Sequence, residues 1–132
     1  MNILVDSSVW IDFFNGQKNA HTDKLSSLLS TELISIGDII LLEILQGIKN
    51  ERDFKITKSY LQDLQCHQLS NPSLALKAAN HFRYLRSMGV TIRKTIDVVI
   101  ATFCIENDFM LLHNDKDFKP FVSHLKLKTF NL

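Results

Sequence analysis

Short apolar runs alternate along this chain with longer segments whose apolar residues recur at helical spacing, and this alternation constrains the fold most strongly. Residues 3–5 and 109–112 are uninterrupted apolar runs. Runs of this length are typical of parallel strands buried on both faces, and the helices between them form the crossovers. The sequence therefore predicts the α/β fold class, with a three-layer α/β/α domain around a central, mainly parallel sheet.

The pattern also predicts where the individual elements lie. We expect strands at residues 3–5, 32–36, 66–69 and 109–112, with an edge strand within 125–130. We expect helices at residues 9–14, 22–30, 39–47, 50–65, 72–88 and 95–106, with a short helical piece at 118–122. No internal repeat, low-complexity tract or linker interrupts this order.

Length and composition narrow the class of protein. The chain has 132 residues, which suits one core, so we expect a single domain spanning residues 1–132. Hydrophobic residues make up 45% of the chain, which argues against disorder. No apolar run approaches the roughly 20 residues of a membrane span, and no signal peptide pattern is present. Cys66 and Cys104 lack the spacing of a zinc site or a disulfide framework. We therefore expect a cytoplasmic protein without membrane attachment.

Four acidic residues lie in apolar surroundings. Asp6 directly follows the first apolar run, and Asp115 closely follows the run at 109–112. Glu43 lies in the middle of an apolar helical segment, and Asp97 lies in the first turn of another. The carboxyl ends of parallel strands form one edge of a sheet, where ligands bind in such folds. That edge is therefore able to bring all four side chains together.

Each acid also has an interpretation that involves no ligand. Asp6 suits a helix cap, and Asp97 suits the first turn of a helix, where negative charge stabilises the helix dipole. Glu43 can lie on a narrow exposed strip of its helix. Asp115 and Asp117 fall in a polar turn, where aspartates often bond to the local backbone. Each of these interpretations stays open for a residue considered alone, but they are weaker as an explanation of all four acids together.

The chemistry of a shared acidic pocket points to a divalent cation. Four carboxylates cannot lie close together as bare anions at neutral pH, because like charges raise one another's pKa values. Oxygen-rich ligand sets without nitrogen suit Mg²⁺ or Mn²⁺, and such ions promote phosphodiester cleavage. The five histidines show no metal-binding spacing, and no glycine-rich phosphate loop is present. We therefore expect neither a histidine-based metal site nor a nucleotide cofactor.

Together these features resemble the PIN-domain ribonucleases, and specifically the VapC-type toxins of toxin–antitoxin pairs. The resemblance rests on residues 5–14, 43, 96–101 and 111–118, which occur in the family's order. It implies a Mg²⁺- or Mn²⁺-dependent endoribonuclease whose catalytic and metal-ligating acids are Asp6, Glu43, Asp97 and Asp115. Glu43 would either ligate the metal or orient the attacking water. The resemblance also implies a structured RNA substrate such as tRNA, a small cognate antitoxin protein as partner, and a homodimer.

Secondary candidates lie next to these acids. Asp117 is a candidate either as a fifth member of the acidic site or in place of Asp115, and Ser8 is a candidate for supporting a metal-bound water. Many relatives carry a proline shortly before the third acid, and this chain has none there. Instead, Arg93 and Lys94 occur beside the expected site. They either hold substrate phosphate or are solvated loop cations.

Alternatives from other function classes fit less well. A metal-dependent phosphatase of the haloacid-dehalogenase type needs a second aspartate two residues after Asp6, where this chain has Ser8. A signalling receiver domain needs paired acids before the first strand, where only Asn2 is polar. A PIN-fold module that binds RNA or protein without catalysis would share the fold, but the presence of all four acids argues against lost activity. The net charge of +1 neither indicates nor excludes nucleic-acid binding.

Overall fold

Five parallel strands form the centre of the computed structural model, which describes residues 1–132. Their order across the sheet is β3-β2-β1-β4-β5, with β1 in the middle, and every neighbouring pair is parallel. The strands are β1 (Asn2–Val5), β2 (Leu33–Gly37), β3 (Gln65–His67), β4 (Met110–Leu112) and β5 (Lys128–Thr129). The prediction of a mainly parallel sheet is confirmed, and the sheet has no antiparallel pair.

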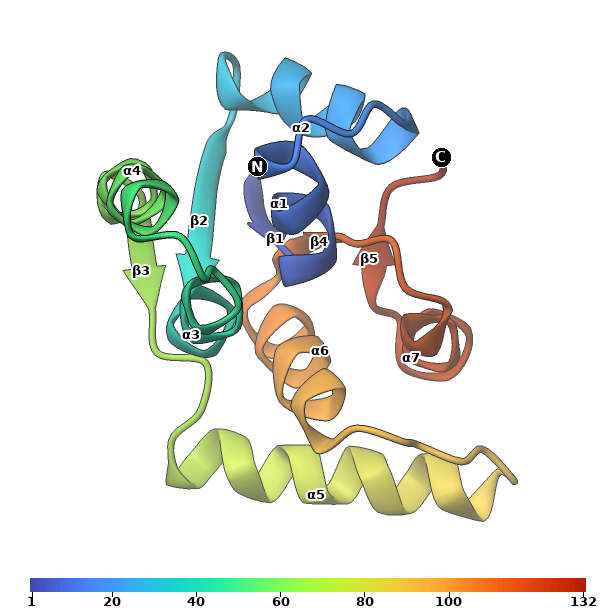
Figure 1. The fold of residues 1–132 in the computed structure, drawn as a ribbon. Coiled ribbons are helices and arrows are strands. Elements are labelled where there is room, and N and C mark those ends of the chain that lie inside the picture. The colour runs from blue at the N-terminus through green and yellow to red at the C-terminus, as the bar shows by residue number, and fades with distance from the viewer.

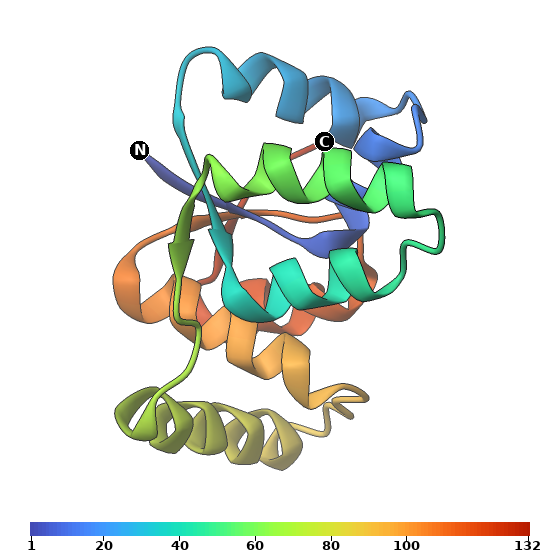
Figure 2. The ribbon, with the colours of Figure 1, turned by 60° about the vertical axis from the view of Figure 1, so that its left-hand side comes forward.

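Helices cover both faces of this sheet (Figures 1 and 2). They are α1 (Ser7–Phe14), α2 (Ala20–Leu29), α3 (Asp38–Gln46), α4 (Glu51–Gln62), α5 (Pro72–Ser87), α6 (Thr95–Asn107) and α7 (Lys119–Leu125), with a 3₁₀ turn, η1 (Lys116–Phe118), before α7. Because crossovers between parallel strands are right-handed, α1 to α4 lie on one face and α5 to α7 on the other. The predicted three-layer α/β/α class is confirmed. None of the helices combines the length and the apolar character that a bilayer span requires.

The central strand forms because its side chains are buried on both faces. Residues 3–5 of β1 are fully buried, as is Leu111 of the neighbouring β4. The backbone N–H of Asp6 donates to the carbonyl oxygen of Leu112 at 2.9 Å, so the pairing of β1 with β4 continues one residue beyond β1. This bond fixes the position of Asp6 against the carboxyl end of β4.

Local capping explains where several helices begin. The helix α1 starts at Ser7, earlier than predicted, because the side chain of Asp6 caps it. The helix α2 starts at Ala20, because Asn19 and Thr22 form a capping box in which each side chain accepts a bond from the other's backbone N–H. The strand β5 is shorter than the predicted edge strand, since α7 extends into that segment.

Gly37 is required by close packing at the point where β2 passes into α3. A Cβ atom at this position would overlap the side chain of Leu69. Leu69 is fully buried, so its side chain has no free space into which it can move. Its backbone N–H also donates to the carboxylate of Asp38 at 3.1 Å, which holds this loop against the start of α3. The packing therefore fixes the helix that carries Glu43.

We predict that Gly37→Ala lowers the free energy of unfolding by about 1–3 kcal/mol, because overpacking a buried site costs that much. Urea denaturation at equilibrium measures this change. Gly47→Ala is the matched control, since a Cβ at Gly47 meets only backbone oxygens at 3.7 and 3.8 Å. Equal stabilities of the two variants would contradict the packing constraint at Gly37.

Candidate metal centre

Asp6 lies directly after β1, at the carboxyl edge of the sheet, and its side chain has a structural role as a helix cap. Its side chain caps α1, where Oδ2 accepts bonds from the backbone N–H of Ser8 at 3.3 Å and from the Ser8 hydroxyl at 2.7 Å. The capping interpretation is therefore confirmed. Asp6 is only 6% exposed, and these bonds involve Oδ2 alone, so capping leaves Oδ1 free for another partner.

Asp97 is the most deeply buried acid of the site. It lies in the first turn of α6 and is 4% exposed. Burial is the main cause that raises the pKa of its carboxyl group to about 6, and the nearby charges of Asp115 and Asp6 contribute in the same direction. The ammonium group of Lys94 acts in the opposite direction. Asp97 is therefore harder to ionise than an ordinary aspartate, and a cation beside it favours its charged form.

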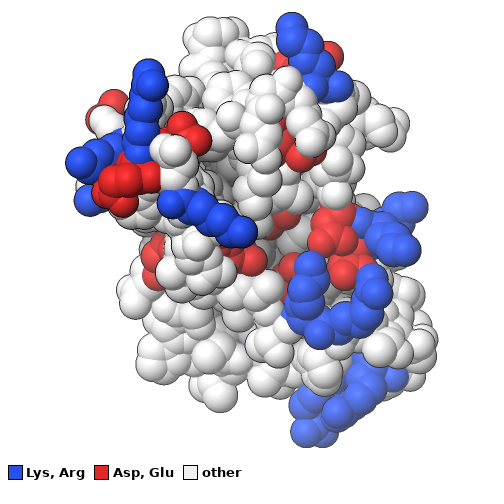
Figure 3. Space-filling model, viewed as in Figure 1, with Lys and Arg blue, Asp and Glu red and all other residues white.

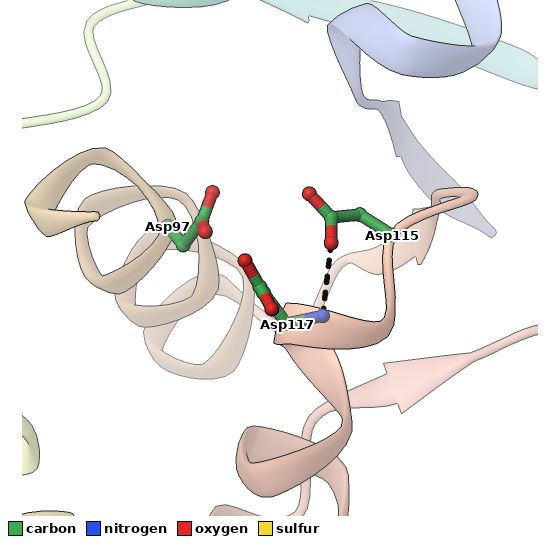
Figure 4. A group of neighbouring side chains, drawn as sticks. All are labelled: Asp97, Asp115 and Asp117. Carbon is green, nitrogen blue, oxygen red and sulfur yellow. Dashed lines mark hydrogen bonds between the residues drawn. The ribbon is translucent and has the colours of Figure 1, made fainter. Parts of the chain in front are cut away.

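Three carboxylates come together at this edge of the sheet (Figure 4). One oxygen from each of Asp97, Asp115 and Asp117 lies within 4.8 Å of the other two. Asp115 caps η1, where its Oδ1 accepts a bond from the backbone N–H of Asp117 at 2.9 Å (Figure 4). This short turn brings Asp117 into the group beside Asp115. Asp117 thus lies next to both Asp115 and Asp97. The sequence alone left open whether Asp117 is an additional member of the acidic site or takes the place of Asp115.

Glu43 lies outside this group of three, and the charges that act on it are those of Asp6 and Lys94. Its Oε1 atom is buried and has no hydrogen-bond partner. Burial raises the pKa of the Glu43 carboxyl group, and the charge of Asp6 raises it further, whereas Lys94 and the Ser7 hydroxyl lower it. Glu43 is half-buried between exposed neighbours on its helix, so the interpretation as part of an exposed strip holds for part of the side chain, while its Oε1 atom is shielded from solvent.

Two cations of the chain pair with these carboxylates. The ammonium nitrogen of Lys94 lies 3.2 Å from Oδ2 of Asp115 and 3.7 Å from Oδ2 of Asp97. Arg93 donates from Nη2 to Oδ1 of Asp117 at 2.7 Å. On the face shown in Figure 3, acidic side chains gather with basic side chains around them. Arg93 and Lys94 are exposed, yet they are bound to site acids and are not freely solvated.

These ion pairs and local bonds set the charge state of Asp115. Burial acts to raise its pKa, but the bond from the Asp117 backbone N–H and the ammonium group of Lys94 outweigh burial and hold the pKa below its usual range. The backbone N–H of Asp115 also donates to Nδ1 of His113 at 3.2 Å, and the His113 ring packs on Phe118. His113 therefore orients the turn that carries the acids.

A polar pocket adjoins the carboxylate group. It has a volume of about 300 Å³ and lies between the segment before α6 and the segment that leads into α7. The acids Asp97 and Asp117 line it together with Arg93, Lys116 and Lys119. Neither of these lysines pairs with a carboxylate, since all ion pairs within 4.0 Å involve other cations.

The donor set fits a hard divalent cation. Its side-chain donors are carboxylate oxygens, and one of them, Oε1 of Glu43, is buried without a partner. Oxygen ligands of this kind suit Mg²⁺ or Mn²⁺ better than zinc or copper. The side chain of Ser8 links Asp6 to the loop after β4, because its hydroxyl accepts a bond from the backbone N–H of Asn114 at 3.4 Å. The ligand roles of the individual residues stay predictions.

The raised pKa of Asp97 gives a testable pH dependence. Stabilisation by its protonated form is complete below the unfolded pKa of about 4 and is lost as pH rises through about 6. In metal-free protein, Asp97→Asn should therefore gain about 1–3 kcal/mol in free energy of unfolding over the wild type between about pH 4 and pH 7. Urea denaturation across this pH range, in the presence of a chelator, measures the difference.

The control for this experiment is Asp108→Asn, because Asp108 is exposed at the far end of α6. We expect its difference from the wild type to show no such rise with pH. A stability difference between Asp97→Asn and the wild type that stays constant or shrinks as pH rises would contradict the burial of an ionisable Asp97.

Comparisons with known proteins agree with this geometry. The family model of the PIN domain matches residues 3–121. Ribonuclease VapC11 of Mycobacterium tuberculosis is 27% identical to this chain over 118 residues, which cover 88% of each protein. VapC ribonuclease Mb1587 of Mycobacterium bovis is similar to the same extent. The structure of VapBC2 from Rickettsia felis, bound to a promoter DNA fragment, superposes with a TM-score of 0.79 at 20% identity, covering 100% of this chain and 99% of the other. The extent of the family match, nearly the whole chain, shows that this protein belongs to the PIN-domain family.

Proposed function

We propose that this chain is a metal-dependent endoribonuclease that acts as the toxin of a toxin–antitoxin pair. The observation that carries the proposal is the group of carboxylates at the carboxyl edge of the sheet, which includes the buried Asp97. An unpartnered oxygen of Glu43 lies buried nearby. Buried and half-buried carboxylates gathered in this way favour a bound divalent cation. The relatives named as ribonucleases support RNA as the substrate class.

Each acid has a proposed role in hydrolysis. When bound, Mg²⁺ or Mn²⁺ supplies an activated water and stabilises negative charge on the leaving oxygen. Asp6, Asp97 and Asp115 are the proposed ligands, and Asp117 is proposed as a fifth member because its carboxylate lies in the same group. Glu43 is proposed to ligate the ion or to orient the attacking water, because its Oε1 atom is buried and has no hydrogen-bond partner in the protein.

Residues around the acids have proposed roles in orienting a ligand oxygen and in contacting the RNA. Ser8 holds the carboxylate of Asp6 through its hydroxyl, which orients the ligand oxygen that α1 does not use. Arg93 lines the polar pocket beside the acids, where a guanidinium group is suited to contact a phosphate of the RNA backbone. This position supports a role for Arg93 in binding substrate next to the proposed hydrolytic site.

The proposed partners follow from the proteins that this chain resembles. Structured RNA such as tRNA is the proposed substrate, a small cognate antitoxin protein is the proposed inhibitor, and a second copy of the chain completes a homodimer. Structures of similar fold are described as VapBC assemblies, one of them bound to promoter DNA, which supports an antitoxin partner. We expect this activity in the cytoplasm, where such RNA is found.

We predict that the purified chain, free of any partner, cleaves total RNA into discrete fragments with Mn²⁺ or Mg²⁺ but not with EDTA. Asp6→Asn should lower the cleavage rate by on the order of 10²-fold or more, because it removes a ligand charge. The asparagine still caps α1, so the fold should persist. Gel electrophoresis of the fragments over time gives the rate, and circular dichroism checks the fold.

Asp108→Asn is the matched control, since it makes the same chemical change on an exposed acid outside the site. It should cleave at the wild-type rate. Fragments that persist with Asp6→Asn would indicate a contaminating nuclease and contradict the acidic site. Absence of cleavage by the wild type across RNA classes, with retained RNA binding, would favour a binding module without catalysis.

A further inference from the structure

The segment before α6 supplies a cation to each member of the three-carboxylate group. Lys94 lies between Asp115 and Asp97, at 3.2 and 3.7 Å, and Arg93 contacts Asp117 at 2.7 Å. No other Lys or Arg lies within ion-pair distance of these acids. The chain therefore neutralises much of the charge on its own acidic group.

The backbone of Lys94 is held in place, whereas its side chain is largely exposed to solvent. It is the N-cap residue of α6, so its Cα position is tied to the helix that carries Asp97. Its side chain is 52% exposed, whereas that of Asp97 is 6% exposed. An exposed ammonium group bound to carboxylates is held weakly, because water competes for it. Lys94 can thus move its charge out of the group without a change in the backbone.

Lys94 contacts two of the three carboxylates that are proposed to hold a divalent ion. Its ammonium group lies closest to Oδ2 of Asp115 and Oδ2 of Asp97, two members of the group within 4.8 Å. A divalent cation on the same oxygens would be repelled by the ammonium group at this distance. Arg93 differs, because it pairs at Asp117 alone and lines the adjoining pocket.

We propose that Lys94 is a tethered counter-ion of the acidic group, which a divalent ion has to displace, so that Lys94 sets the affinity of the site for Mg²⁺ or Mn²⁺. The inference rests on the proposed metal-dependent function and adds a determinant of metal affinity to it. In the absence of the metal ion, the ammonium group holds the carboxylates together. When the ion binds, Lys94 turns toward solvent at the rim of the site.

Calorimetric titration of Mn²⁺ into the metal-free, full-length chain tests this inference without any measurement of activity. Lys94→Gln removes the competing charge and should bind Mn²⁺ more tightly than the wild type by on the order of tenfold. Lys94→Arg keeps the charge and should bind no more tightly than the wild type. Lys119→Gln is the matched control, because Lys119 lines the adjoining pocket but contacts no carboxylate, and its affinity should stay within about twofold of the wild type.

The outcomes separate the inference from the function on which it rests. Equal Mn²⁺ affinity in Lys94→Gln and the wild type would overturn the counter-ion role and leave the metal site intact. An equal gain in Lys94→Gln and Lys119→Gln would also overturn it, because general surface charge would then explain the effect. Absence of Mn²⁺ binding in all four proteins would overturn the proposed metal centre together with the inference.

Discussion

Mutual repulsion of carboxylates at one edge of a parallel sheet is the constraint on which the rest of this structure depends. Asp6 directly follows the central strand β1, and the loop after the neighbouring strand β4 carries Asp115, so the pairing of these strands brings acids to the same edge. Burial of Asp97 under the same edge raises its pKa, and the other acids add to that effect. The fold therefore concentrates negative charge that must be offset by cations.

The chain offsets that charge by means that lie close in sequence to the acids. Lys94 and Arg93 precede Asp97 by a few residues and reach across to the turn that carries Asp115 and Asp117. The same residues that stabilise the metal-free site therefore stand beside the place where a divalent ion and a phosphate would bind. The same charges therefore affect both the stability of the metal-free protein and the proposed binding of the ion, as expected where titratable groups are buried at a functional site.

Asp6 illustrates how one residue can satisfy two requirements. The α1 helix needs a cap at its start, and Asp6 supplies it through Oδ2. The proposed metal site needs an oxygen at the end of the central strand, and Oδ1 of the same residue remains available. The backbone of a residue between a buried strand and a helix is held in place by both elements. The side chain of such a residue therefore has a well-defined position in a site.

Much of the fold followed from the sequence because its signals are local. Uninterrupted apolar runs such as residues 3–5 predict buried strands, and their alternation with helical segments predicts a parallel sheet. The four main acids were identified from their apolar surroundings. Asp117 could not be assigned in the same way, because its place beside Asp97 depends on the 3₁₀ turn capped by Asp115.

Contacts between distant segments could not be inferred from local pattern either. The pairing of Lys94 with Asp115 joins residues 21 positions apart, and only the packing of α6 against the η1 turn brings them together. The burial of the Glu43 Oε1 atom also depends on tertiary packing. The adjacent residue of the same helix, Leu42, is exposed, so the apolar sequence around Glu43 does not by itself show which atoms are buried. Sequence patterns predict which residues are candidates, whereas packing decides how they meet.

The most direct test of the central claim is the anomalous diffraction of Mn²⁺ in crystals of the full-length chain soaked with the ion. We expect a single strong site at the carboxyl edge of the sheet, roughly 2 Å from carboxylate oxygens that include those of Asp97 and Asp115. The electron density for Lys94 should then lie away from Asp115. Strong Mn²⁺ density elsewhere on the protein, with Lys94 still bound between Asp97 and Asp115, would contradict the account.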